Sequence, residues 1–244
     1  MNVSLWRLPD APLRASAVTS TIIGLLALMV LALTARTALP LGDLYPLKAS
    51  AAFMAVMLLS FGFLRRHHPF EYFGAANQIT TARAMLVALV AGLIGEPRFP
   101  MVAASAAAAS LLATALDGVD GWLARRHRIA SDFGARFDME IDALLILVLA
   151  ILAWRNEKAG AWVVLSGLLR YAFAAAGAFA PWLRAALPPS RRRQTICAIQ
   201  LVALTLALLP AVRPPLSALL AAAALLTLGY SFLVDAQWLS RHAG

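Results

Sequence analysis

Residues 117–142 read DGVDGWLARRHRIASDFGARFDMEID, and they gather six of the chain's twelve acidic residues in one short stretch. The rest of the sequence is apolar, because 61% of the 244 residues are hydrophobic and only 14% are charged. The mean hydropathy is +0.77. The length would suit one or two soluble domains, but this composition is typical of a protein that lies in a membrane.

Long apolar runs lie on both sides of the acidic stretch. A membrane-spanning helix needs about 20 mostly apolar residues, and the runs reach roughly that length. They are rich in Ala, Leu and Val and lack polar alternation, which argues against a membrane β-barrel. We predict an all-α polytopic membrane protein with about eight transmembrane helices. The predicted spans are 17–38, 47–64, 77–95, 100–121, 136–154, 159–183, 195–212 and 215–238.

The net charge of +9 follows the predicted topology. Most of the 21 Lys and Arg residues fall on the side of the N-terminus, which the positive-inside rule assigns to the cytoplasm. Eight spans then place both termini in the cytoplasm, and the arginines give no reason to expect nucleic acid as a partner. The first apolar run is long for a signal peptide from Ala17 onward, so we interpret it as an uncleaved span.

The aspartates of the acidic stretch fall on the facing ends of two predicted helices. At about 100° per residue, Asp117 and Asp120 share one helix face, and Asp138 and Asp142 share another. The loop between the helices is short, so both ends lie on the cytoplasmic side and are neighbours. Glu140 points away from its neighbouring aspartates. Four carboxylates are therefore expected to converge on one pocket.

Such a cluster needs a compensating positive charge, because like charges and desolvation both disfavour ionised carboxylates at a membrane boundary. Oxygen ligands suit Mg²⁺ or Mn²⁺, and two such ions would form the clamp used in phosphoryl transfer. Cys197 is the single cysteine, which excludes a cysteine-based metal site, and we interpret it as a small buried core residue. The alternative for the acidic stretch is a solvated loop with accidental spacing.

Small residues and an arginine accompany the carboxylates. Gly121, Ala124 and Gly134 leave room for a ligand against the helices, and Arg125 can bind phosphate through two hydrogen bonds. Together these residues predict a site for a metal-bound diphosphate.

The complete spacing is Asp117-x2-Asp120-Gly121-x2-Ala124-Arg125-x8-Gly134-x3-Asp138-x3-Asp142. It resembles the signature of the CDP-alcohol phosphotransferases, also called CDP-alcohol phosphatidyltransferases, at every fixed position. The wider resemblance covers about residues 70–240 and implies a catalytic core of six helices. Two further helices then precede the core, so we divide the chain into an N-terminal segment, 1–68, and a catalytic membrane domain, 69–244.

The resemblance implies a role for each motif residue. Asp117, Asp120 and Asp138 would bind two divalent ions, and Asp142 would bind one ion and act as the general base. The cytidine diphosphate portion of the donor would contact Gly121, Ala124, Arg125 and Gly134.

A second segment, NQITTAR at 77–83, resembles the Asn-x-Leu/Ile-Thr-x-x-Arg opening of the first core helix in the family, although Ala76 replaces the usual proline. The resemblance implies that Asn77 and Thr80 contribute to donor binding. Helix capping is the alternative for these two residues, and snorkelling to lipid phosphate is the alternative for Arg83.

The family reaction joins an alcohol hydroxyl to the lipid-side phosphate of the donor and expels CMP. We expect CDP-diacylglycerol as the donor, with a soluble CDP-alcohol as the alternative, and phospholipid biosynthesis in a bacterial inner membrane as the setting. The resemblance also allows a homodimer.

The identity of the acceptor depends on a second set of arginines. Arg170 lies near the middle of a predicted span, where a charge is unfavourable and usually faces a bundle interior. With Arg191, Arg192 and Arg193 it would form an anion site beside the aspartates. We therefore expect an anionic acceptor, such as glycerol 3-phosphate, inositol phosphate or an anionic lipid. Serine or choline is the alternative, and both arginine groups also have structural explanations, as an ion pair or as positive-inside residues.

Two other classes of protein remain. An intramembrane prenyltransferase would need a second aspartate motif, whereas Asp235 stands alone near the end of the chain. A cation-coupled transporter would favour inverted repeats and a mid-membrane site, neither of which the sequence indicates.

Overall fold

The computed structural model describes residues 11–67, 71–127, 131–185 and 187–242, and the side chains of 63, 65–67, 120–127 and 184 lie outside the description. Within these ranges the chain forms eight α-helices and no strand, as predicted. Two short 3-10 helices flank α6 where the sequence predicts one longer span: Gly160 is the N-cap residue of the first, and Pro181 begins the second. The helices are α1 (Ala11–Ala38), α2 (Tyr45–His67), α3 (Ala75–Gly92), α4 (Pro100–His127), α5 (Asp132–Arg155), η1 (Ala161–Val164), α6 (Leu165–Phe179), η2 (Pro181–Arg184), α7 (Arg191–Leu208) and α8 (Leu216–His242).

Five of the described helices are long and apolar enough to cross a membrane: α1, α2, α4, α8, and α6 together with η1. The three remaining helices, α3, α5 and α7, begin with polar segments that contain Asn77, Asp138 and Arg192. Polar residues in membrane helices usually face a bundle interior or an aqueous cavity. Each of these three helices carries part of the predicted site, as α4 and α6 also do, and the protein is an all-α polytopic membrane protein.

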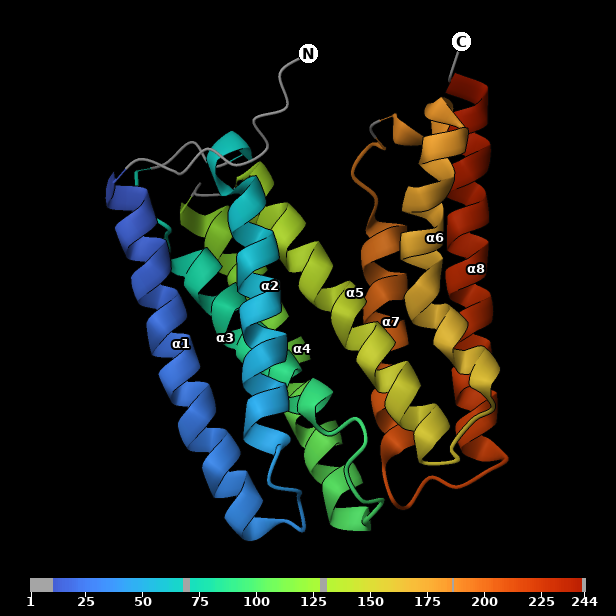
Figure 1. The fold of residues 1–244 in the computed structure, drawn as a ribbon. Coiled ribbons are helices and arrows are strands. Elements are labelled where there is room, and N and C mark those ends of the chain that lie inside the picture. Colours follow the sequence, from blue (N-terminus) through green and yellow to red (C-terminus); the bar gives the residue numbers. More distant parts are fainter. Residues whose placement is uncertain (1–10, 68–70, 128–130, 186, 243–244) are drawn as a thin grey trace. The chain divides into compact units, whose positions relative to one another are not determined.

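The chain forms two compact units, Met1–Ile141 and Asp142–Gly244, and their boundary falls inside α5. In the first unit α3 lies at the centre, and α1, α2 and α4 all pack against it (Figure 1). In the second unit α8 packs along α7 and also against α6.

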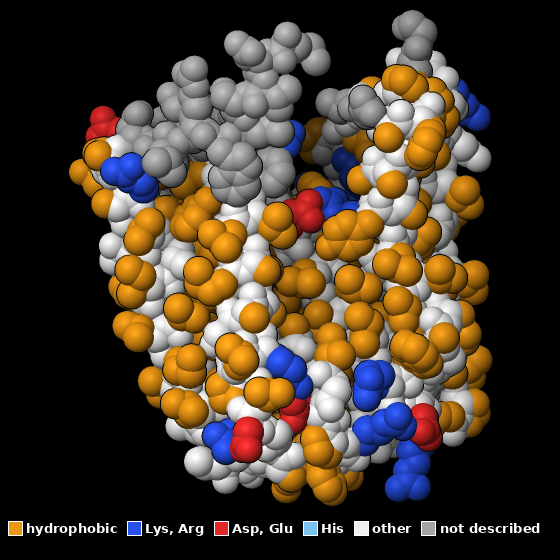
Figure 2. Space-filling view, viewed as in Figure 1, with side chains coloured by type: hydrophobic (Ala, Val, Ile, Leu, Met, Phe, Trp, Pro, Cys, Tyr) orange, Lys and Arg blue, Asp and Glu red, His pale blue; other side chains and the backbone are white. Residues whose placement is uncertain are grey.

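The surface of the helices is apolar on the sides that do not pack within a unit. On α1 the buried positions recur every three or four residues and form one stripe: Leu13, Ala17, Thr21, Gly24, Leu28 and Ala32. Large apolar side chains such as Leu26, Leu59 and Leu226 are instead exposed. Figure 2 shows apolar side chains over the outward faces of the helices and few charges along their middle. Lipid is the solvent that suits such faces.

Hydrogen bonds tie the two N-terminal helices to the first helix of the predicted core. The backbone N–H of Phe73, just before α3, donates to Ser16 Oγ of α1 at 3.0 Å. The Tyr45 hydroxyl of α2 donates to the carbonyl oxygen of Leu89 in α3 at 3.2 Å. The helices that precede the predicted core are therefore part of the same compact unit as α3 and α4.

Glu96, in the loop between α3 and α4, connects this loop to α2 and to the loop that precedes α2. Its carboxylate pairs with the Lys48 ammonium, and its Oε2 accepts a hydrogen bond from the Gly42 N–H at 2.6 Å. Lys48 Nζ also donates to the Ile94 carbonyl at 3.2 Å. Burial alone would raise the pKa of Glu96, but the hydrogen bonds from Lys48 and Gly42 and the Lys48 charge together lower it below its ordinary value.

We expect Glu96→Gln to lower the free energy of unfolding by about 2 kcal/mol at pH 7, since a charge-assisted pair is lost from a side chain that is only 5% exposed. A carboxyl with a lowered folded pKa stabilises the fold above its unfolded pKa of about 4.5, and this stabilisation is lost as the pH falls through the folded pKa. Thermal unfolding of purified protein from pH 7 to well below pH 4.5 should therefore show a smaller acid-induced loss of stability in Glu96→Gln. The control is Asp43→Asn, which removes the exposed Arg36–Asp43 pair and should change stability by less than about 1 kcal/mol. Equal effects of the two variants would contradict the expectation.

The second unit has its own polar connection. Lys158, after α5, donates through Nζ to the carbonyl oxygens of Leu209 and Val212 at 2.8 and 2.6 Å. Ser217 Oγ of α8 donates to the Lys158 carbonyl at 2.6 Å. These bonds satisfy carbonyl groups that follow the end of α7 and fix the start of α8 beside them.

Candidate active site

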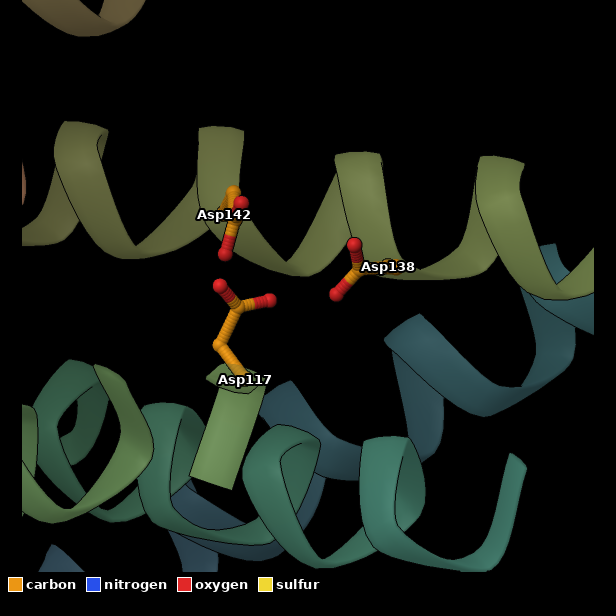
Figure 3. A group of neighbouring side chains, drawn as sticks. All are labelled: Asp117, Asp138 and Asp142. Atoms are coloured by element: carbon orange, nitrogen blue, oxygen red, sulfur yellow. The ribbon is translucent and has the colours of Figure 1, made fainter. Parts of the chain in front are cut away.

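Three aspartates predicted as metal ligands lie together. Asp117 lies on α4, and Asp138 and Asp142 lie one turn apart on the continuous helix α5, so that both point to the same side. One carboxylate oxygen from each residue lies within 4.8 Å of the other two. Figure 3 shows the three side chains pointing into the same space. The juxtaposition expected for these three residues is therefore present.

The remaining motif residues of α4 fall on positions whose side chains lie outside the description. Asp120, Gly121, Ala124 and Arg125 continue helix α4 beyond Asp117. Their predicted roles, as a metal ligand for Asp120 and as donor-binding residues for the other three, stay predictions.

Arg83 lies at the base of the acidic cluster. Its guanidinium is fully buried, and Nη1 contacts Asp117 Oδ1 at 2.9 Å and pairs with Asp138 Oδ1. Its Nε donates to the carbonyl oxygen of Ala113 on α4 at 3.1 Å. The snorkelling alternative for Arg83 is wrong, because the side chain points into the protein and joins α3 to the two aspartates.

The charges and donor atoms of this cluster fit a divalent cation. Asp117, Asp138 and Asp142 bring three carboxylates, and Arg83 returns one positive charge, so the described groups retain a net negative charge. The available donor atoms are carboxylate oxygens, which suit Mg²⁺ or Mn²⁺ rather than a soft metal. A group of oxygens within 4.8 Å of one another is compact enough to share one ion.

The start of α5 is fixed by its own residues. Ser131 Oγ accepts a hydrogen bond from the Gly134 N–H at 3.0 Å, which is the arrangement of a helix N-cap. A Cβ atom added to Gly134 would lie 2.9 Å from Asn77 Oδ1. Gly134 therefore permits close approach of the Asn77 side chain, in addition to any room that it leaves for a ligand. Phe133 packs between Phe73 and Phe137, with ring centroids 5.9 and 5.7 Å away.

Asn77 and Thr80 lie in the first turns of α3 and are buried. Neither caps the helix: the N-cap residue is Gly74, whose φ of 81° suits glycine, and no side-chain capping bond is present there. Asn77 Nδ2 donates instead to the Phe73 carbonyl at 2.5 Å, and Thr80 Oγ1 donates to the Ala76 carbonyl at 3.1 Å. The capping alternative is therefore wrong, whereas donor binding by these residues stays a prediction.

The predicted acceptor arginines lie on α6 and α7 in the second unit. Arg170 is half-buried on α6, and Arg191 is exposed at the first position of α7. Arg192 Nη2 and Arg193 Nη1 both contact Asp235 Oδ1 of α8, at 2.5 and 3.2 Å. Asp235, which belongs to no second aspartate motif, therefore pairs with two of the arginines across α7 and α8.

Cys197 is not a simple core residue. It is half-buried on α7, and its Sγ lies 3.6 Å from Asp142 Oδ2, where the thiol donates to the carboxylate. The prediction of a buried packing role is wrong in this respect, because the thiol contacts one of the clustered aspartates.

Residues 73–232 match the family model of the CDP-alcohol phosphatidyltransferases. The match covers more than half of the chain and contains the three clustered aspartates together with Arg83. The chain belongs to the CDP-alcohol phosphatidyltransferase family. No curated protein and no solved structure matches it.

As a CDP-alcohol phosphatidyltransferase, the protein is a membrane-embedded transferase of phospholipid biosynthesis. Its family transfers a phosphatidyl group from a CDP-alcohol to an alcohol and uses a divalent metal. Membership decides against the prenyltransferase and the transporter. The acidic stretch is accordingly better explained as a metal site than as a solvated loop with accidental spacing.

Sequence reasoning missed the contacts that three residues, Arg83, Ser131 and Cys197, make in the site of the transferase. An arginine within an apolar run usually pairs with a buried acidic residue, and this signal was present in the sequence for Arg83. Ser131 precedes the helix with the spacing of an N-cap, Ser-x-x-Gly, and could also have been found. Nothing in the sequence signals the contact of Cys197, because it depends on how α5 and α7 pack.

Proposed function

We propose that the protein transfers a phosphatidyl group from CDP-diacylglycerol to the hydroxyl of an anionic alcohol and releases CMP. The observation that carries the proposal is the group of carboxylates of Asp117, Asp138 and Asp142, with oxygens within 4.8 Å of one another. Such a group suits the diphosphate of a metal-bound CDP-alcohol, which is the donor class of the family.

The reaction forms a bond between the acceptor oxygen and the lipid-side phosphorus and breaks the bond from that phosphorus to the oxygen of CMP. Divalent cations held by Asp117, Asp120, Asp138 and Asp142 would supply charge stabilisation for the diphosphate. Mg²⁺ and Mn²⁺ both suit these ligands, and we propose two ions.

We propose that Asp142 also takes the proton of the acceptor hydroxyl. Cys197 donates a hydrogen bond to Asp142 Oδ2, which favours one orientation of the carboxylate. Asp117 and Asp138 are held by contacts with the Arg83 guanidinium.

Donor binding is proposed for Asn77 and Thr80 in the first turns of α3, and for Gly121, Ala124, Arg125 and Gly134 on the two helices that carry the aspartates. Arg170, Arg191, Arg192 and Arg193 are proposed to bind the acceptor, and their charges favour an anionic one. Arg193 precedes Cys197 by four residues on α7, so the two lie on one face about one turn apart. This face links the arginines to the proposed base.

We further propose a bacterial inner membrane as the location, with the site and both termini facing the cytoplasm, supported by the positive-inside bias. We also propose the division into residues 1–68 and 69–244, and the start of the family match at residue 73 supports it. A homodimer stays a prediction.

The experiment that tests the function is CMP release by the purified protein from CDP-diacylglycerol, with Mg²⁺ or Mn²⁺ and with paired acceptors. Glycerol 3-phosphate is compared with glycerol, and inositol phosphate with inositol, since the members of each pair differ only in the phosphate. Serine, choline and an anionic lipid complete the panel, and a soluble CDP-alcohol tests the alternative donor.

We expect acceptor-dependent CMP release that is at least about tenfold faster with the phosphorylated member of a pair, because charge-assisted hydrogen bonds to arginine are lost without the phosphate. Faster release with serine or choline would overturn the anionic acceptor and leave the family reaction intact. Release only from the soluble CDP-alcohol would overturn CDP-diacylglycerol as the donor.

A further inference from the structure

A buried carboxylate of α8 organises the arginines at the start of α7. Asp235 Oδ1 accepts from Arg192 Nη2 at 2.5 Å and from Arg193 Nη1 at 3.2 Å. Arg192 Nη1 also donates to the carbonyl oxygen and the hydroxyl of Ser231, at 2.7 and 2.8 Å. Ser231 and Asp235 are one turn apart on α8, so they form a single receptor for the Arg192 side chain.

These contacts oppose an unfavourable arrangement of charge. Three consecutive arginines lie in the first turn of α7, where the helix dipole disfavours cations and the side chains repel one another. One carboxylate offsets only part of the positive charge of Arg191, Arg192 and Arg193. The cluster therefore remains positive, and two of its three members are held in place.

The exposure of the side chains shows which groups can still meet a ligand. The Asp235 side chain is 8% exposed, whereas those of Arg192 and Arg193 are 27% and 29% exposed. The carboxylate thus acts as a buried anchor, and the guanidinium groups extend from it to the surface of the unit.

The hydrogen-bond inventory of Arg192 leaves one side of the guanidinium available. A guanidinium has five N–H donors, and Arg192 uses both donors of Nη1 and one of Nη2 on Ser231 and Asp235. Among the described residues, no partner is present for the N–H of Nε or for the second N–H of Nη2. Adjacent nitrogens of this kind bind phosphate through two parallel hydrogen bonds.

The arginines also lie close to the reacting end of α7. Arg193 and Cys197 are one helical turn, or about 6 Å, apart along the axis, and Cys197 Sγ lies 3.6 Å from Asp142 Oδ2. All of these residues belong to the second unit. A phosphate bound by the arginines would place the rest of a small alcohol within reach of the proposed base.

We propose that Asp235 is a positioning residue for acceptor recognition: with Ser231 it holds Arg192 and Arg193 so that their remaining N–H groups bind the phosphate of the acceptor. This inference rests on the proposed function, since it assigns the specificity for an anionic acceptor to a rigid arginine pair. Either a soluble phosphorylated alcohol or an anionic lipid would supply the same phosphate chemistry.

The variant Asp235→Asn distinguishes positioning from simple electrostatic attraction, because the two explanations predict opposite changes in the KM for the acceptor. Loss of a negative charge makes the cluster more positive, so attraction alone would lower KM for an anionic acceptor. Loss of positioning instead raises KM. We expect KM for the preferred phosphorylated acceptor to rise about tenfold, the scale for weakening one charge-assisted contact. The kcat and the KM for CDP-diacylglycerol should stay within about twofold.

Matched variants and acceptors complete the experiment. Asp43→Asn removes the carboxylate of an exposed arginine pair and should leave all constants unchanged. Asp235→Glu keeps the carboxylate and should restore part of the affinity. With the unphosphorylated member of the acceptor pair, Asp235→Asn should behave as the unsubstituted protein does. Soluble and lipid acceptors are assayed separately, which identifies the source of the phosphate.

Each outcome is decisive. A lower or unchanged KM in Asp235→Asn would overturn the positioning role while the proposed function stands. A preference of the unsubstituted protein for serine or choline would overturn both the anionic acceptor and this inference. If Asp235→Asn does not purify as a folded protein, Ser231→Ala takes its place, because it removes one hydrogen bond of Arg192 and keeps every charge. A rise of KM by about threefold is then expected, and no change would overturn the inference.

Discussion

Asp142→Asn is expected to lower acceptor-dependent CMP release by about a thousandfold, the scale of removing a general base that also contributes to charge stabilisation. The amide cannot accept the hydroxyl proton as the carboxylate can, and it is a weaker ligand for a hard cation. Asp142 also lies within 4.8 Å of two further carboxylates, so the change affects the centre of the cluster.

The measurement is CMP release with the preferred acceptor, followed by binding of a labelled cytidine nucleotide with and without Mg²⁺. We expect metal-dependent binding to persist in Asp142→Asn, weakened by about tenfold, because Asp117 and Asp138 remain. The matched control is Asp132→Asn, which changes an exposed aspartate in the first turn of the same helix and should leave the rate within about twofold. A rate in Asp142→Asn within tenfold of the unsubstituted protein would contradict the assignment of the base.

Arg83→Met is expected to destabilise the protein by about 3 kcal/mol and to abolish most of its activity. Removal of one partner of a buried ion pair costs about 3–5 kcal/mol, and the lower end applies because the side chains of Asp117 and Asp138 are 37% and 35% exposed. The Ala113 carbonyl also loses its donor. Activity falls because the two aspartates lose the group that orients them.

The thermal unfolding of Arg83→Met should depend more strongly on Mg²⁺ than that of the unsubstituted protein. Without the guanidinium the carboxylates repel one another more, so a bound cation relieves a larger repulsion and stabilises the variant more. The comparison is the difference in Tm between excess Mg²⁺ and a chelator. Arg36→Met, which removes an exposed arginine from its pair with Asp43, serves as the control and should show the ordinary difference. An equal Mg²⁺ response in Arg83→Met and the unsubstituted protein would show that Arg83 does not share the electrostatics of the cluster.

Much of the architecture could be predicted because it depends on local composition. The long apolar runs set the number of helices, since only a helix satisfies its own backbone in lipid over such a length. The boundary errors have local causes as well. In the sixth predicted span, the regular helix gives way to 3-10 helices next to Gly160 and at Pro181. The fourth helix extends beyond its predicted end to His127 and includes the motif residues after Asp117.

Part of the candidate site could likewise be predicted from the spacing of residues, and part could not. The positions of Asp138 and Asp142 on one helix face follow from their spacing of four residues, and the approach of Asp117 follows from the short connection. The identity of the partners of Arg83 and the pairing of Asp235 with Arg192 could not be predicted, because each contact joins residues 34 or more positions apart along the chain.

The sequence by itself determined the helical membrane architecture, the family and the set of aspartates, because helical periodicity and apolar length are properties of neighbouring residues. Only the tertiary structure decided which cations meet which carboxylates. Arg83, for which snorkelling to lipid phosphate was the alternative, is buried against Asp117 and Asp138, and Asp235, which belongs to no second aspartate motif, holds Arg192 and Arg193. The physical reason is that a charged side chain in an apolar environment must find a partner, and the partner that it finds depends on the packing of helices distant in sequence.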